Sequence, residues 1–228
     1  IVGGGYEVYG SGMGSDFAIA RLDADGAFDT SFAGSGWTVF HDKTESSTSN
    51  RVNKLAVAAD GSIAFAGYHT AGENMTGLIL GRLGADGAID AGFGDATTPG
   101  FLAPPVLPTA QSVNATGLLL QDDGKLLVSA GYFAFPDRQT FFALRTTADG
   151  QLDAGFGTAG VLQADLAPDG SYSESSAMTL QPDGRIVLAG RSMRSTESPI
   201  VEFAATRLLN ASGPDDRIFG DGFDGPAP

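Results

Sequence analysis

Two series of Asp-Gly pairs divide the sequence into units of about sixty residues. The first series runs through NKLAVAADGSIAFAGYH, ATGLLLQDDGKLLVSAGYF and AMTLQPDGRIVLAGRS. Its spacings are 63 and 60 residues, between Asp60, Asp123 and Asp183. The second runs through FAIARLDADGAFDTSF, LILGRLGADGAIDAGF and FALRTTADGQLDAGF. Its spacings are 61 and 63 residues, between Asp25, Asp86 and Asp149. Because two independent sets of landmarks agree, the chain is predicted to fold as a repeat.

The repeat predicts one domain over residues 1–228. Its approximate units are 1–50, 51–110, 111–170 and 171–228. The last unit is degenerate, since the segment from Glu202 keeps the Arg and the Asp-x-x-Phe-Gly, inserts one residue between them and replaces Asp-Gly by Asn-Ala-Ser-Gly. The opening IVGGG aligns with IAFAG, LVSAG and IVLAG. The first unit therefore lacks its first strand, and we expect a second copy or an upstream portion of the chain to complete it.

Each unit is predicted to contain four β-strands. The apolar runs on either side of the first Asp-Gly form a hairpin, for which we expect a two-residue type I′ turn. A third strand covers GLILGRL, and a short fourth covers segments such as GVLQADL (160–166) and GWTVFHD (36–42). Four meandering strands repeated every sixty residues are typical of β-propeller blades. We predict an all-β fold, a propeller of about four blades, either closed by itself or part of a larger ring.

The two ends of the chain look like a chymotrypsin-type serine protease, which begins with IVGG and carries GDSGGP around its nucleophile. Here the closing segment reads GDGFDGP, and Gly222 stands where the nucleophilic serine would have to be. Without that hydroxyl no acyl-enzyme forms. The protease hypothesis is therefore rejected.

Two segments resemble the delta-60 repeat family of bacterial exported proteins. They are RLDADGAFDTSFAGSGW (21–37) and MTLQPDGRIVLAGRS (178–192). The resemblance implies a β-propeller-like fold and a secreted or cell-envelope location in a bacterium. It implies no catalytic residues that could be transferred to this chain.

Composition limits the partners. The chain has 13 basic and 27 acidic residues and a formal net charge of -14, which disfavours nucleic acid and anionic membrane surfaces. No apolar run reaches the roughly 18 to 20 residues of a membrane span. There is no cysteine, and His41 and His69, the only histidines, lie in different units. A transition-metal site is therefore not expected, and we expect both histidines at the surface.

An arginine and an aspartate recur eight residues apart in three units and nine apart in the last. A pair present in every unit indicates a structural ion pair that fixes a turn to a strand. The phenylalanine of Asp-x-x-Phe recurs likewise, and we expect it to pack between blades. The pairs are Arg21 and Asp29, Arg82 and Asp90, Arg145 and Asp153, and Arg207 and Asp216.

Two sets of acidic residues are candidates for chemistry. Asp23, Asp25 and Asp29 follow a D-x-D-G-x-x-D pattern in the first unit alone, and their oxygens suit Ca²⁺. The Asp-Gly turn by itself also accounts for this pattern. The non-repeated Glu73, Glu174 and Glu197 lie in variable connections, where a propeller glycosidase could assemble its two carboxylates.

Loops that vary in length on a repeated frame favour a binding platform. We expect a non-enzymatic exported propeller that binds a protein or a glycan, or that associates with itself through open blade edges. The alternative is a propeller hydrolase acting on an extracellular polymer such as a polysaccharide.

Overall fold

The chain folds into antiparallel β-sheets. The computed structural model describes residues 1–7, 14–41, 49–72, 75–105, 112–133, 139–164, 166, 172–194, 200–210 and 217–218. All regular elements in these ranges are β-strands, so the all-β prediction is confirmed.

The strands form four sheets in chain order, one for each predicted unit. The first contains β1 (Val2–Glu7), β2 (Ser15–Ala20) and β3 (Trp37–Phe40). The second contains β4 (Arg51–Val57), β5 (Ile63–Gly72), β6 (Met75–Leu83) and β9 (Phe101–Leu102). The third contains β10 (Ser112–Leu120), β11 (Leu126–Phe133), β12 (Phe141–Thr146) and β13 (Val161–Ala164). The fourth contains β14 (Ser173–Leu180), β15 (Ile186–Arg194), β16 (Ile200–Leu208) and β17 (Arg217–Ile218). A small ribbon of β7 (Gly94–Asp95) and β8 (Thr98–Pro99) precedes β9.

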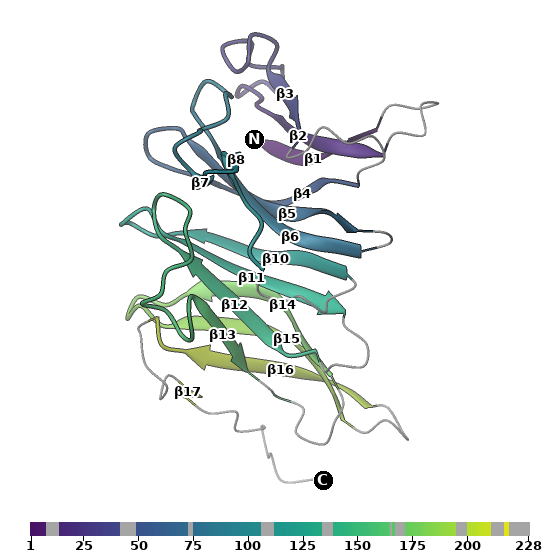
Figure 1. Cartoon of the computed structure of the whole chain (residues 1–228), viewed down its shortest axis with the longest axis vertical. Coiled ribbons are helices and arrows are strands. Elements are labelled where there is room, and N and C mark those ends of the chain that lie inside the picture. The colour runs from purple at the N-terminus through teal and green to yellow at the C-terminus, as the bar shows by residue number, and fades with distance from the viewer. Residues whose placement is uncertain are drawn as a thin grey trace.

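The sheets follow one another in an open row. Figure 1 shows β1–β3 at one end of the molecule and β14–β17 at the other. The first strands of neighbouring sheets lie against each other, since β10 contacts both β4 and β14, and β4 contacts β1. This arrangement is that of propeller blades, but the described strands do not close into a ring. We call the contacts between successive sheets the first, second and third joints.

The predicted hairpins are present, but their turn type was predicted wrongly. A type I′ turn needs two residues with positive φ, whereas only Gly61 has one here, at 85°. The Gly61 N–H donates to the Ala58 carbonyl, and the Ala58 N–H donates to the Ser62 carbonyl at 2.9 Å. Each loop thus has three residues and ends in a left-handed glycine. Asp60 avoids positive φ and instead accepts the Ser62 N–H on its carboxylate at 2.9 Å.

A β-bulge recurs in the first strand of the second, third and fourth sheets. The register shifts between Val52 and Lys54, between Ala115 and Gly117, and between Ser175 and Ala177. The bulge brings the backbone of the first strand close to the second strand. A Cβ on Gly190 would overlap the Glu174 carbonyl oxygen, and one on Gly67 would overlap that of Arg51. This close approach explains the glycine of Ala-Gly in the second and fourth sheets, whereas a Cβ on Gly131 of the third sheet would make only ordinary contacts, the nearest at 3.6 Å.

Each joint is filled by its own hydrophobic cluster. The first joint holds five phenylalanines, Phe32 among them, and the ring centroids of the other four, Phe17, Phe40, Phe65 and Phe101, lie 5.2 to 6.1 Å apart. The second and third joints are mainly aliphatic. The core is therefore a series of layers between sheets, which is how a repeat protein distributes its stability.

Candidate functional site

The predicted Arg-Asp pairs lie at the joints. Arg21 Nε donates to Asp29 Oδ2 at 2.8 Å, and Arg82 Nε donates to Asp90 Oδ2 at 2.7 Å. Arg145 Nε donates to Asp153 Oδ2 at 2.9 Å. Each guanidinium also lies over the phenylalanine of its own unit, with 4.8 to 5.1 Å from Cζ to the ring centroids of Phe32, Phe93 and Phe156.

Each of these arginines also reaches into the next sheet. Arg21 Nη1 donates to the Ala85 carbonyl at 2.7 Å, and Arg82 Nη1 donates to the Ala148 carbonyl at 2.6 Å. Arg145 Nη1 donates to the Asn210 carbonyl at 3.0 Å. Sequence reasoning missed this third partner, because a main-chain oxygen leaves no trace in the residue pattern. We call an arginine with its aspartate, phenylalanine and acceptor carbonyl a clamp.

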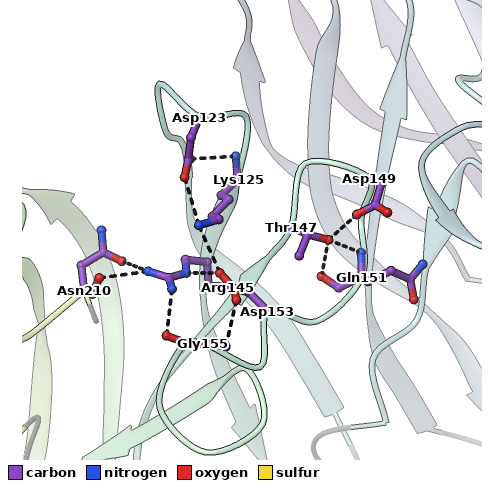
Figure 2. A network of polar contacts seen from close by, with 9 residues as sticks. All are labelled: Asp123, Lys125, Arg145, Thr147, Asp149, Gln151, Asp153, Gly155 and Asn210. Carbon is purple, nitrogen blue, oxygen red and sulfur yellow. Dashed lines mark hydrogen bonds and ion pairs between the residues drawn. The ribbon is translucent and has the colours of Figure 1, made fainter. Parts of the chain in front are cut away.

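Figure 2 shows the clamp at the third joint, whose arginine makes more hydrogen bonds than Arg21 or Arg82 among the described residues. Arg145 Nη1 also donates to the Asn210 side-chain oxygen at 2.6 Å, and Nη2 donates to the Gly155 carbonyl at 3.0 Å. Lys125 Nζ lies 3.5 Å from Asp153. Burial raises the pKa of Asp153, but the hydrogen bond from the Gly155 N–H and the charges of Arg145 and Lys125 outweigh it. The pKa therefore lies below the ordinary 3.8.

The structure describes only one residue of the fourth predicted Arg-Asp pair. Arg207 is on β16 with an exposed side chain, and Asp216 lies outside the described residues.

Two of the three predicted calcium ligands, Asp23 and Asp29, bond different partners, and Asp25 is exposed. Asp23 Oδ1 accepts the backbone N–H groups of Asp25 and Ala27, at 3.0 and 2.9 Å. Asp29 bonds Arg21 and Ser31, and its pKa is lowered first by the Ser31 hydroxyl and backbone N–H and then by Arg21. Within the described part of the chain, no three His, Cys, Asp or Glu side chains form a group that could hold a metal ion.

The prediction that both histidines lie at the surface was wrong for one of them. His41 is exposed, but His69 is buried, with 6% of its surface accessible.

A groove of about 650 Å³ crosses the first strands of the second, third and fourth sheets. Its volume is in the range of small-ligand sites. Lys54 lines it from β4, while Thr116 and Ser176 line it at the bulges of β10 and β14. A bulge turns a side chain away from its regular direction, and bulges are frequent beside binding sites.

The groove wall is rich in hydroxyl, amide and phenol groups. Thr116 Oγ1 in the lining lies 3.3 Å from Ser175 Oγ of the fourth sheet and 3.0 Å from the Oγ of Ser129, which is buried and outside the lining. The Tyr132 hydroxyl accepts the Thr140 N–H at 3.1 Å, which fixes its ring at the groove. Asn114 and Gln139 add amide groups to the lining.

One ion pair stands in the groove. Arg191 Nε donates to Glu174 Oε1 at 2.7 Å, and the Arg191 guanidinium lies 5.9 Å from the centroid of the Tyr172 ring. Glu174 is the one carboxylate among the described lining residues. The other two acids considered for hydrolysis, Glu73 and Glu197, lie outside the described residues.

Sequence reasoning singled out Glu174 but missed the groove. The groove depends on three first strands lying side by side, and these strands are about sixty residues apart in sequence. The polar residues on the first strand, opposite the repeated Ala-Gly of the second strand, were the available signal, such as Asn114 to Thr116 and Ser175 to Ser176.

A protein family described as "Domain of unknown function (DUF5122) beta-propeller" matches residues 1–32 and 121–156. Each matched segment contains the Arg, Asp and Phe of one clamp, from Arg21 to Phe32 and from Arg145 to Phe156. The match supports a β-propeller-like repeat. No curated protein matches the chain. The described residues also contain no helix that is long and apolar enough to cross a membrane.

Proposed function

We propose that this chain is a non-enzymatic binding module of the delta-60 type, exported by a bacterium, and that its groove binds a neutral oligosaccharide. The observation that carries the proposal is the groove lining, in which hydroxyls, amides, the Tyr172 ring and Lys54 accompany a single ion pair. Sugars are recognised by such groups because each hydroxyl both donates and accepts, and phenol rings offer flat apolar surfaces. The net charge of -14 disfavours a polyanionic ligand.

The hydrolase alternative has less support. Glycoside hydrolysis ordinarily requires two carboxyl groups on opposite sides of the scissile bond, about 5 to 9.5 Å apart. The described groove lining contains one carboxylate, Glu174, and this carboxylate accepts a hydrogen bond from Arg191 Nε at 2.7 Å. The groove as described therefore favours binding.

The test is calorimetric titration of the chain with neutral cello-, malto- and chito-oligosaccharides of increasing length. We expect at least one series to bind, and Tyr172→Ala and Arg191→Ala each to weaken that binding about tenfold or more, because the ring and its covering guanidinium are removed. Arg185→Ala is the matched control, since Arg185 forms a similar ion pair with Asp183 at 2.7 Å outside the groove.

The reaction mixtures are also assayed for new reducing ends. Binding without cleavage supports the proposal. Cleavage that disappears in Glu174→Gln would establish the hydrolase instead, and no heat with any series would reject an oligosaccharide ligand.

A further inference from the structure

The last sheet exposes side-chain positions that the other sheets bury. In the first three sheets, the residue four positions before the clamp arginine is buried because it packs against the next sheet. These residues are Phe17, Leu78 and Phe141, with exposed fractions of 0%, 3% and 0%. The equivalent residue on β16 is Phe203, which is 75% exposed. Val201, two residues earlier on the same strand, is 56% exposed. We call this surface the tail face.

The first sheet shows the converse. In the strand register, Val2 is paired with the residue that precedes the clamp arginine of the first sheet. The residues at the same register position in the other sheets are Phe65, Val128 and Leu188. These three are at most 1% exposed, whereas Val2 is 58% exposed. Trp37 is 42% exposed, and its equivalent Phe101 is 4% exposed. Tyr6 stacks on Trp37 with centroids 6.0 Å apart, so these side chains share one surface, the head face.

The two faces carry the two halves of a joint. In the first joint the Phe17 ring lies 5.8 Å from Phe65 and 6.1 Å from Phe101. By equivalence, Phe203 on a tail face would lie between Val2 and Trp37 on a head face.

The polar half matches as well. Arg207 is the exposed equivalent of the clamp arginines, and Ala24 is the equivalent of their acceptors Ala85 and Ala148. The turn beside Ala24 is uncovered: a Cβ on Gly26 would meet nothing within 4 Å, whereas one on Gly87 or Gly150 would meet Phe32 or Phe93 of the preceding sheet at 2.9 or 2.8 Å.

We propose that the tail face binds the head face of a second copy of this chain, forming a further joint in which Arg207 donates to the Ala24 carbonyl. A second copy is the occupant that the surfaces specify, since it presents both the apolar and the polar half in the required register. Within one chain the two faces lie at opposite ends of the row and do not meet (Figure 1). Because the contact is head-to-tail, copies form a closed ring if the curvature permits, or otherwise an open chain of molecules.

The absence of cysteine permits a direct test. Val2→Cys and Phe203→Cys chains are prepared separately and mixed under oxidising conditions. We expect a disulfide-linked dimer in the mixture and little in either variant alone. Light scattering of the unmodified chain over a range of concentrations should show association that strengthens with salt, because salt screens the repulsion between chains of net charge -14.

The matched pair of variants is Phe203→Asp and Phe28→Asp. Phe28 is also exposed, at 57%, but its equivalent Ile89 remains 40% exposed within the row, so this position lies outside the joints. We expect Phe203→Asp to weaken association about tenfold or more while Phe28→Asp leaves it unchanged. Melting curves check that both variants fold.

If the chain is a monomer at every concentration, the proposal is overturned. The two faces would then be explained as contact surfaces for further sheets of a longer polypeptide. Efficient cross-linking of Phe203→Cys with itself would overturn the head-to-tail arrangement.

Discussion

The first and third joints are built from the same parts but differ in which contacts are buried. At the first joint, the hydrophobic cluster contains five phenylalanines, and the side chains of Arg21 and Asp29 remain 23% and 31% exposed. At the third, the cluster is mainly aliphatic, and the side chains of Arg145 and Asp153 are only 8% and 13% exposed. The same clamp is therefore expected to contribute more to the free energy of unfolding at the third joint, where it is buried, than at the first.

The largest effect is expected at the first joint's aromatic cluster. Phe65→Ala removes a ring that contacts Phe17, Phe40 and Phe101, and should lower the free energy of unfolding by about 3 to 5 kcal/mol. Urea unfolding followed by tryptophan fluorescence measures it, because Trp37 lies in the first sheet. A loss below about 1 kcal/mol would contradict the assignment of this joint to apolar packing.

Next in size is the clamp of the third joint. Arg145→Ala leaves Asp153 nearly buried, with Lys125 at 3.5 Å as its remaining cation, and deprives two carbonyls of their donor. We expect a loss of about 2 to 4 kcal/mol in urea unfolding followed by circular dichroism. Arg185→Ala is the control, since its ion pair is exposed and lies outside the joints.

The same change at the first joint should be smaller. Arg21→Ala removes an ion pair that water screens, so the loss should be about 1 kcal/mol or less. Equal losses for Arg21→Ala and Arg145→Ala would show that burial does not set the strength of the clamp.

The hairpins and the repeat length were predictable from the sequence because they depend on local residues, such as the glycine after Asp60 and Asp123. The turn type was not, since a three-residue loop ending in a left-handed glycine uses the same Asp-Gly letters as a type I′ turn. The Arg-Asp spacing predicted a pair, and the structure places Arg145 beside Asp153. The hydrogen bond from Arg145 to the Asn210 carbonyl could not be predicted, because this bond depends on how the third and fourth sheets are stacked.

The smallest expected effect is on acid stability. The pKa of Asp153 is lowered in the folded state, so the folded chain binds fewer protons than the unfolded chain just below pH 3.8. The contribution of Asp153 is therefore fully present above about pH 5 and is lost as the pH falls through the lowered pKa. Melting temperatures between pH 2 and 7 should fall less steeply below pH 4 in Asp153→Asn than in the unmodified chain. Parallel slopes would contradict this contribution.

The clamp has a consequence for how such chains change over generations. Its acceptor is a main-chain oxygen, supplied by alanine at Ala85 and Ala148 and by asparagine at Asn210. The receiving unit can therefore mutate its side chain there without losing the bond, and the donating unit needs no matching mutation. A duplicated or deleted unit would therefore keep the arginine-carbonyl bond of its joint, and only the apolar side chains of the two sheets would have to adapt to each other.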